Sequence, residues 1–384
     1  MEKWKQCTIA DLGTVVTGKT PSTKIAEFWD GVVHFVTPKD IQGLKHITDT
    51  ERRITEAGLQ KVKGSALPPR AVCVSCIGNI GYTGMTTKYC VSNQQINSIV
   101  VNDDNDPDFV YYLMRSLWDF FKNYEGQSTT LSILNKTQFS KIAVSVPAKA
   151  TQIRIAAVLS SLDEKIAANT RINDNLQQQA SALYEKYFPY AVTDELPAGW
   201  RVGTVGEIVE IHDSKRIPLS GAQREKMEKR IYPYYGAASL MDYVDEYIFD
   251  GKYLLLGEDG TVVDDAGYPI LQYVWGQFWV NNHAHILTGK LGFNVESLLL
   301  LFKRTPVKSI VTGAVQPKIS QANLRSVQVV VPPVEELDTF NELIRPMFDR
   351  IRQNQDQNKA LAAMRDALLP KLMSGEVDVS TIQI

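Results

Sequence analysis

The sequence lacks the apolar segments that would send a chain to a membrane or out of the cell. Among its 384 residues there is no run of about 18 consecutive apolar residues, the length that a membrane-spanning helix needs. The N-terminal stretch MEKWKQCTIADLG has no apolar core of the kind found in signal peptides. Hydrophobic residues make up 44% of the chain and charged residues 22%, as in ordinary globular proteins. We therefore expect a cytoplasmic protein of two or three domains.

Neither sign of charge dominates, and the motifs of common catalytic sites are missing. The formal net charge is −2, so any contact with nucleic acid must come from local basic patches. The sequence contains no GxxxxGK[ST] phosphate loop and no GxSxG nucleophile turn. The Pro-Pro pairs at 68–69 and 332–333 lack the flanking residues of an amino-methyltransferase motif. The residues therefore indicate neither a catalytic centre nor a cofactor.

Cysteine is scarce, with Cys7, Cys73, Cys76 and Cys90 as its four occurrences. Cys73 and Cys76 form a CxxC pair, which could indicate zinc binding or redox chemistry. The surrounding AVCVSCIG has the pattern of a strand, in which side chains three residues apart point to opposite faces. No second CxxC or histidine pair lies at the spacing of a zinc finger. We predict buried free thiols and no metal.

An internal repeat is the strongest pattern in the chain. When Val146-Pro147 is placed over Val331-Pro332, the offset is 185 residues, and it holds without a gap over about forty residues. The aligned pairs share apolar or asparagine side chains: Ile155/Phe340, Leu159/Ile344, Leu162/Met347, Ile166/Ile351, Asn169/Asn354, Asn173/Asn358, Leu176/Leu361 and Leu183/Leu368. The chain therefore contains two copies of one element.

The repeated element has the spacing of a long helix. Its apolar positions alternate four and three residues apart, which predicts a heptad seam. The first seam runs through Ile155, Leu159, Leu162, Ile166, Asn169, Asn173, Leu176, Ala180, Leu183 and Tyr187, and the second through Phe340, Ile344, Met347, Ile351, Asn354, Asn358, Leu361, Arg365, Leu368 and Leu372. Pro346 has no backbone donor, so we expect a kink or break near 344–346. Two amphipathic helices on separate cores would explain the spacing too, but not the repeated asparagines.

The seam asparagines predict how the two helices pair. Two copies of one element can pack around a pseudo-two-fold axis. An antiparallel register that puts Asn169 opposite Asn358 also puts Asn173 opposite Asn354. The same register brings apolar residues together at nearly every layer, including Ile155/Leu372, Leu159/Leu368 and Tyr187/Phe340. We expect the central asparagines to fix this register.

A domain-sized segment precedes each helix, and the two segments look alike. Both are rich in short strands, and both close on similar stretches, GQSTTLSILNKTQFSKIAVSVP and GAVQPKISQANLRSVQVVVP. Both carry an apolar strand with Asn near its middle, CVSNQQINSIV and WVNNHAHIL. We predict an α+β chain of two similar mixed α/β domains, separated by two long helices packed as an antiparallel coiled coil. The predicted limits are 1–150 for the first domain, 151–192 for the first helix, 193–333 for the second domain, and 334–384 for the second helix and tail.

These segments, in this order, resemble the specificity subunit of Type I restriction–modification enzymes. The resemblance covers nearly the whole chain. It is carried by LGTVVTGKTPSTKIAEFWDG, VTPKDI, YPYYGA, WVNNHAHIL, GAVQPKIS and the closing LLPKLMSGEV. It implies two target-recognition domains, each reading one half of a split sequence in double-stranded DNA. It further implies that the two helices separate the domains and bind two methyltransferase subunits, that endonuclease subunits join the complex, and that the subunit itself has no catalytic centre.

Local basic stretches supply candidates for the DNA contacts. Residues 39–70 hold seven basic and four acidic residues, and residues 212–235 hold six basic and three acidic ones, with tyrosines close behind. Lysine and arginine bind phosphates, and arginine can read guanine with two hydrogen bonds. A solvated loop face would explain the same charges. The predicted DNA-binding residues are Lys19, Thr20, Ser22, Lys39, Arg52, Arg53, Lys215, Arg216, Arg224, Tyr234, Tyr235 and Lys318.

Two other functions stay open on the sequence. A metal-dependent nuclease could use Asp259 with His283 and His285, which share a face if NNHAHIL is a strand. The GEDG turn at 257–260 has SCIG as its counterpart in the first half, so a shared glycine turn explains both, although Glu258 or Asp259 could also accept from cytosine. A scaffold that assembles partners without reading bases is the second alternative.

Overall fold

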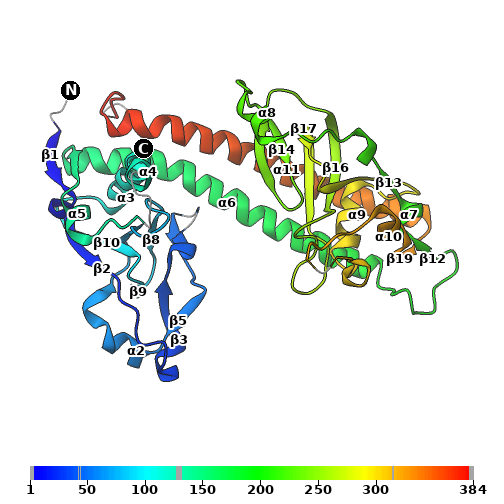
Figure 1. Ribbon diagram of the computed structural model, residues 1–384, viewed down its shortest axis with the longest axis horizontal. Helices are drawn as coiled ribbons and strands as arrows, with labels where there is room; N and C mark the ends of the chain where they lie inside the picture. Colours follow the sequence, from blue (N-terminus) through cyan, green and yellow to red (C-terminus); the bar gives the residue numbers. More distant parts are fainter. Residues whose placement is uncertain (1–3, 42, 44, 127–131, 314, 380–384) are drawn as a thin grey trace. The chain divides into compact units, whose positions relative to one another are not determined.

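The computed structural model describes residues 4–41, 43, 45–126, 132–313 and 315–379. The chain divides into two compact units (Figure 1). Unit 1 consists of Met1–Asn169 and Gln355–Ile384, and unit 2 of Thr170–Asn354. Parts of the predicted closing stretch, residues 127–131 and 314, lie outside the described residues. The predicted domain limits stay a prediction.

The described residues of unit 1 form three sheets, with strand orders β1-β11, β2-β10-β7-β8-β4 and β5-β3-β9-β6. Its strands are β1 (Lys5–Thr8), β2 (Gly13–Thr17), β3 (Trp29–Val36), β4 (His46–Ile47), β5 (Arg52–Ile54), β6 (Ala66–Leu67), β7 (Val72–Ser75), β8 (Thr83–Thr86), β9 (Cys90–Ser92), β10 (Ile96–Val101) and β11 (Ala143–Val146). Its helices are α1 (Ile9–Leu12), α2 (Glu56–Lys61), α3 (Pro107–Ser116), α4 (Trp118–Gly126) and α5 (Lys136–Ser140), together with parts of the two long helices.

Unit 2 contains a two-stranded sheet, β12-β19, and a six-stranded sheet, β13-β18-β16-β17-β14-β15. Its strands are β12 (Arg201–Thr204), β13 (Val209–Ile211), β14 (Tyr232–Tyr235), β15 (Leu240–Val244), β16 (Phe249–Gly257), β17 (Leu271–Val280), β18 (Ala284–Gly289) and β19 (Gln328–Val331). Its helices are α7 (Val205–Ile208), α8 (Gly221–Glu225), α9 (Val295–Phe302) and α10 (Gln321–Ser326). The two long helices are α6 (Lys149–Tyr187) and α11 (Val334–Met373), and each begins in one unit and ends in the other.

The two units share a frame of strands. In unit 1, β10 pairs antiparallel with β2 and β7, and in unit 2, β18 pairs antiparallel with β13 and β16. Each frame is preceded by a one-turn helix whose first turn is closed by a capping box, at Thr8 and Asp11 in unit 1 and at Thr204 and Glu207 in unit 2. The predicted similarity of the two halves is confirmed.

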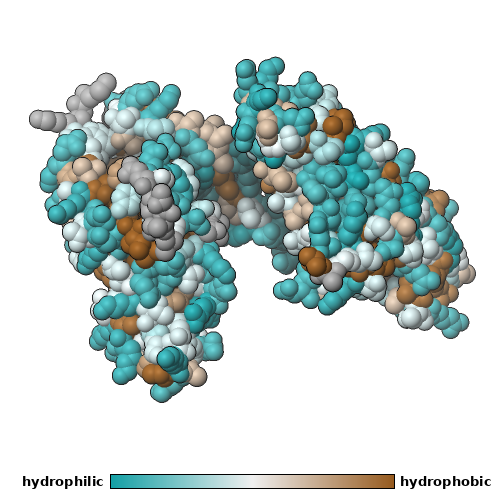
Figure 2. Space-filling model, in the orientation of Figure 1, coloured by the Kyte–Doolittle hydropathy of each residue, from teal (hydrophilic) through white to brown (hydrophobic). Residues whose placement is uncertain are grey.

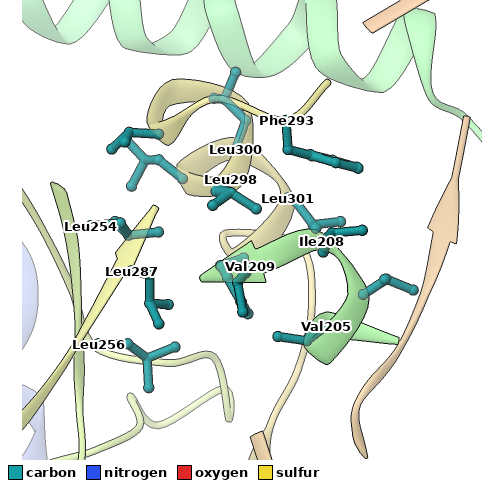
Figure 3. Close-up of a cluster of buried hydrophobic side chains, with 14 of the residues drawn as sticks. Val205, Ile208, Val209, Leu254, Leu256, Leu287, Phe293, Leu298, Leu300 and Leu301 are labelled. Atoms are coloured by element: carbon teal, nitrogen blue, oxygen red, sulfur yellow. The ribbon is translucent and has the colours of Figure 1, made fainter. Parts of the chain in front are cut away.

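The main core of unit 2 lies between the frame strands and α9 (Figure 3). Leu254 and Leu256 from β16 face Leu287 from β18, Val209 from β13 and Leu298 from α9. Alternate residues of a strand point to one face, which explains why Leu254 and Leu256 share this core while Leu255 belongs to another cluster. Burying one such side chain stabilises the fold by roughly 1.5–3 kcal/mol.

The two long helices pack against each other inside each unit. In unit 1, Ile155 and Leu159 of α6 lie in one core cluster with Leu369 and Leu372 of α11. In unit 2, the rings of Tyr187 and Phe340 have centroids 5.5 Å apart. Low residue numbers of one helix meet high residue numbers of the other, so the packed segments are antiparallel as predicted.

The asparagine pairs confirm the predicted register. In unit 1, Asn169 Nδ2 donates to Asn358 Oδ1 at 2.9 Å, and Asn358 Nδ2 donates to the carbonyl of Ile166 at 3.4 Å. In unit 2, the equivalent atoms repeat both bonds: Asn354 donates to Asn173 at 2.8 Å, and Asn173 donates to the carbonyl of Ile351 at 3.3 Å.

Of the kink or break predicted near 344–346, the break is wrong, because α11 runs without interruption through Pro346. The kink stays a prediction. Proline cannot donate to the carbonyl one turn earlier, which costs one helical hydrogen bond. Ile344 and Phe348 on either side are buried in the core of unit 2 at 0% and 1% exposure. We attribute the continuity of the helix to this packing. Among the described helices, none combines the length and the apolar character needed to cross a membrane.

The cysteines behave as the strand pattern predicts. Cys73, on β7, belongs to one core cluster and Cys76, just beyond it, to another, so the two thiols lie on different faces of the sheet. Both thiols are free and buried. Burial raises the pKa of Cys73 to about 11 and that of Cys76 to about 12, so neither is a ready thiolate.

Candidate nucleic-acid interface

Unit 1 joins several loops at the end of its frame strands. The backbone N–H of Cys76 donates to the carbonyl of Gln95 at 2.7 Å, and the N–H of Leu134 donates to the carbonyl of Cys76 at 2.8 Å. The N–H of Gly78 donates to the carbonyl of Ser132 at 3.2 Å. These bonds connect the turn after β7 with the loop before β10 and with the segment that leads to α5.

Unit 2 repeats these three bonds. The N–H of Glu258 donates to the carbonyl of His283 at 2.8 Å, and the N–H of Ile319 donates to the carbonyl of Glu258 at 2.8 Å. The N–H of Gly260 donates to the carbonyl of Pro317 at 2.9 Å. We call this arrangement the loop junction: residues 18–24, 76–81, 93–95 and 132–134 in unit 1, and 214–219, 258–263, 281–283 and 317–319 in unit 2.

The glycine turns of the two loop junctions correspond as the sequence indicated. Gly78 in SCIG and Gly260 in GEDG have φ angles of 76° and 83°. This left-handed conformation is open to glycine and costly for most other residues. The shared turn explains GEDG without an acidic catalytic loop.

Lys19 and Lys215 occupy equivalent positions in the two loop junctions. Each follows by two residues the side chain, Thr17 or Asp213, that is bonded to the frame strand β10 or β18. Both lysines are exposed, and among the described residues no carboxylate lies within ion-pair distance of either. Two positive charges are therefore available at corresponding places.

Other predicted residues of unit 1 lie beside Lys19 or on the sheet next to it. The hydroxyl of Thr20 donates to the side chain of Gln94 in the same loop junction. The carbonyl of Ser22 accepts from the indole N–H of Trp29 at 3.1 Å. The guanidinium of Arg52, on edge strand β5, lies 3.8 Å from the centre of the Trp29 ring. These contacts bring Ser22, Trp29 and Arg52 together.

Arg53 and Lys39 are exposed but paired with acidic residues. Arg53 lies 2.8 Å from Asp49, and Lys39 lies 3.4 Å from Glu51. Such exposed ion pairs are weak, so both side chains could exchange these partners for phosphates.

In unit 2, Lys318 lies in the loop junction, and Arg216 is largely enclosed there. Lys318 is 49% exposed, with its ammonium 3.2 Å from Glu258. Arg216 is only 13% exposed, and its guanidinium donates to Glu258 at 2.5 Å and to the carbonyl of Ala284 at 2.7 Å. The structure therefore makes Arg216 an internal support and not a surface contact.

The prediction for Tyr234 is also corrected. Its ring is 2% exposed, and its hydroxyl accepts from the N–H of Leu219 at 3.1 Å, so it belongs to the core. Arg224 lies over that ring at 5.0 Å and pairs with Asp242 at 3.0 Å. Tyr235 is partly buried against Phe278. The aromatic stretch behind the basic residues is thus mainly strand packing.

The residues proposed for a nuclease do not converge. His283 lies 2.5 Å from Asp259, whereas His285 turns inward to Asp213 at 2.6 Å and to the carbonyl of Ile319 at 2.8 Å. Both ring nitrogens of His285 are committed to protein atoms.

A different acidic group, Asp213 with Glu258 and His285, is close enough to hold a cation. Its charges are already matched inside the protein. Arg216 pairs with both carboxylates, Lys318 pairs with Glu258, and Gln321 donates to Asp213. This group is a hydrogen-bonded network of the fold, and the arrangement does not favour metal chemistry.

Three polar residues are buried in a way that was not predicted from the sequence. Asp213, Asn97 and His285 are buried at 7%, 3% and 0% exposure. The alignment of CVSNQQINSIV with WVNNHAHIL could have indicated two of them, because it places Asn97 and His285 at matching positions.

The face of each unit that Figure 2 shows is mainly hydrophilic, with apolar residues in small separate patches.

Comparisons with known proteins agree with the repeat. The family model for the Type I restriction modification DNA specificity domain matches residues 1–178 and again 197–361. The chain is 26% identical over 416 aligned residues to the Type I restriction enzyme MjaIX specificity subunit of Methanocaldococcus jannaschii, covering 99% of this chain and 94% of that protein. It is 23% identical to the EcoprrI specificity subunit of Escherichia coli over 85% of this chain and 84% of that one.

A solved structure shares the fold. The Type I restriction–modification S subunit from M. genitalium superposes with a TM-score of 0.58 at 18% identity, covering 97% of this chain and 96% of that one. The family match extends over most of both copies of the repeat. Each matched segment includes one loop junction and two of the four seam asparagines. The chain therefore belongs to the family of Type I restriction–modification DNA specificity subunits.

Proposed function

We propose that this chain is the DNA-recognition subunit of a Type I restriction–modification complex and that each unit reads one half of a bipartite target. The observation that carries the proposal is the duplicated loop junction. It presents an exposed lysine without a carboxylate partner among the described residues at the same place in each unit, Lys19 and Lys215. Such charges bind phosphates and fix the position of a protein on duplex DNA.

Phosphate contacts would position each unit, and neighbouring side chains would read bases. Lys19, Lys215 and Lys318 are the phosphate-binding candidates. Thr20 and Ser22 lie in the same loop as Lys19. Trp29 connects this loop to Arg52, because its indole N–H donates to the carbonyl of Ser22 and the Arg52 guanidinium lies over its ring. Arg52 is the candidate for base reading, because a stacked guanidinium keeps the donors on its edge free for a base.

The partners follow from the same proposal. Two methyltransferase subunits would dock on the exposed faces of α6 and α11, and restriction subunits would join through that complex. The chain itself would be non-catalytic and would act in the cytoplasm, where its target DNA and partner enzymes meet. A nuclease activity finds no support in the geometry, because His285 is fully enclosed.

Exchange of one domain tests the proposal. Residues 1–150 are replaced by the matching segment of a relative with a different target, and the complex is reconstituted with its methyltransferase. We expect the methylated adenines, mapped across a genome, to change in one half of the target only.

Two outcomes would count against the proposal. A change in both halves would contradict separate reading by the two units. Methylation without sequence preference by the unaltered complex would favour the scaffold function, and cleavage of DNA by the purified chain with magnesium would favour the nuclease.

A further inference from the structure

A short polar chain secures the loop junction of unit 1. The hydroxyl of Thr17, the last residue of β2, donates to Asn97 Oδ1 at 2.7 Å. Asn97 Nδ2, on β10, donates to the carbonyl of Leu134 at 3.2 Å. The three residues come from three separate stretches of sequence, and each stretch leads directly into the loop junction.

Unit 2 makes the same connection with different side chains. Asp213 Oδ2 accepts from His285 Nδ1 at 2.6 Å, and His285 Nε2 donates to the carbonyl of Ile319 at 2.8 Å. Asn97 and His285 are both buried and both on the central frame strand. We call each set a bracket: Thr17–Asn97–Leu134 in unit 1 and Asp213–His285–Ile319 in unit 2.

The unit 2 bracket is charged. Asp213 also accepts from the N–H of Ile286 at 3.0 Å and from Gln321 at 2.6 Å. Burial alone would raise the pKa of the Asp213 carboxyl, but the hydrogen bonds from His285 and Ile286 and the charge of Arg216 hold it below its usual value. His285 therefore lies between the carboxylate of Asp213 and the carbonyl of Ile319, two hydrogen-bond acceptors.

Charged side chains also surround the unit 2 bracket. Glu258 lies 3.7 Å from His285, and Arg216 lies 3.4 Å from Asp213. Lys318 lies 3.2 Å from Glu258 and completes the charged groups at this bracket. In unit 1, the bracket consists of a hydroxyl, an amide and a carbonyl, all neutral.

Each bracket works only as a matched pair of side chains. An asparagine has one donor end and one acceptor end, so it fits between a hydroxyl and a carbonyl. Between the Asp213 carboxylate and the carbonyl of Ile319, one end of an asparagine would meet another acceptor in either orientation. A buried polar group left in that state is destabilised.

We infer that Thr17–Asn97 and Asp213–His285 are positioning residues for recognition of the first and second half of the target, respectively. This inference rests on the proposed function. Each bracket fixes the carbonyl at the base of a loop that carries DNA contacts, so loss of one bracket loosens base discrimination in its own half only.

The test uses the full chain reconstituted with its methyltransferase. Methylation is compared between the best target and targets altered at one base in either half. We expect His285→Asn to lower discrimination in the second half by roughly tenfold, the effect of one unpaired buried group, and to leave the first half unchanged. Thr17→Val should do the reverse, because it removes the donor at nearly constant shape.

The double variant Asp213→Thr with His285→Asn supplies the hydroxyl that the asparagine needs. It should recover most of the lost discrimination, and its melting temperature should exceed that of His285→Asn alone. The inference is overturned if the double variant discriminates no better than the single one. Equal losses in both halves, or no loss with His285→Asn, would overturn it as well. Absence of sequence preference in the unaltered complex would instead refute the proposed function.

Discussion

Two adjacent arginines on β5, Arg52 and Arg53, differ in their side-chain contacts. Arg52 lies on Trp29 at 3.8 Å and has no carboxylate within ion-pair distance among the described residues. Arg53 points the other way and pairs with Asp49 at 2.8 Å, as neighbouring residues of a strand must face opposite sides. Stacking restricts the guanidinium plane and leaves its edge donors available for a base.

We predict that Arg52→Ala relaxes the preference for guanine at one position of the first half of the target. The loss should be about 1–3 kcal/mol of discrimination, and Arg52→Lys should lose nearly as much because lysine lacks the planar fork. Methylation of target variants by the reconstituted complex measures the effect.

Arg53→Ala is the matched control and should keep the preference. If Arg52→Ala instead weakens binding to all sequences equally, then Arg52 contacts phosphate and reads no base.

The four cysteines differ in their exposure and therefore in their expected reactivity. Cys7 is partly exposed, whereas burial raises the pKa of Cys73, Cys76 and Cys90. A thiolate-directed alkylating agent at neutral pH should therefore modify only Cys7 in the native protein, and that slowly, because burial and the nearby Asp11 also raise its pKa. Peptide mass spectrometry before and after unfolding reads the result, and rapid native labelling at Cys76 would contradict it.

The basic residue types of the candidate DNA contacts could be predicted from the sequence, but their burial could not. Glycine and proline around Lys19 indicated an exposed loop, and Lys19 is exposed. Arg216 looked equally available, yet Glu258, 42 residues away, encloses it. Lys45 in the first basic stretch likewise pairs with Asp108, at 2.6 Å, and is 7% exposed. A basic stretch in the sequence shows where positive charge is concentrated. It does not show which acidic residue, distant in sequence, the fold places beside each basic side chain.

The long helices contain polar residues where an apolar seam would be more stable. Asn169 is fully buried, and its Oδ1 has no hydrogen-bond partner in the described part of the chain. Such an atom costs about 1–3 kcal/mol. Its amide nitrogen, however, reaches both Asn358 and Gln357, contacts that only one register allows.

We predict that replacing Asn169, Asn173, Asn354 and Asn358 together by leucine raises the melting temperature. The same change should broaden the range of spacings between target halves that the complex methylates, because the seam no longer specifies one register. Calorimetry and methylation of targets with altered spacers measure the two effects.

Asn175→Leu, on an exposed position of α6, is the control and should change neither quantity much. A stabilised variant with an unchanged spacing preference would contradict the register function of the asparagines.

The helices were the most predictable elements because their periodicity is local and long. The register followed from adding one symmetry argument to that periodicity, and Tyr187 does meet Phe340. The effect of Pro346 was not predictable in the same way, since it depends on how firmly Ile344 and Phe348 are packed. The sequence predicted that the units are rich in short strands. It did not predict how these strands pair, because their partners lie far away in sequence.

The methyltransferase surface that we propose lies on the exposed faces of the two long helices. Glu164, Lys165 and Arg350 are exposed on them. Arg352 is different: it is 17% exposed, lies 2.9 Å from Glu296, and also contacts Tyr273 and Asp349. It ties α11 to α9 and β17 inside unit 2.

We predict that charge reversal at Glu164, Lys165 and Arg350 weakens association with the methyltransferase in gel filtration while the melting temperature of the isolated chain stays nearly constant. Arg352→Glu should do the opposite and lower the melting temperature first, because it removes one of the two cations paired with the buried Glu296 and places a second carboxylate beside it. Unaltered assembly of the triple variant would place the partner surface elsewhere.

The two brackets also have a consequence for inheritance. Residues 213 and 285 are compatible only in certain combinations, and so are residues 17 and 97, while each bracket lies within one unit. Selection should therefore treat each pair as a single heritable unit. Across related genes, position 213 should covary with 285 and position 17 with 97, but the two pairs should vary independently. A duplicated chain built this way can acquire a new specificity in one half without a compensating mutation in the other.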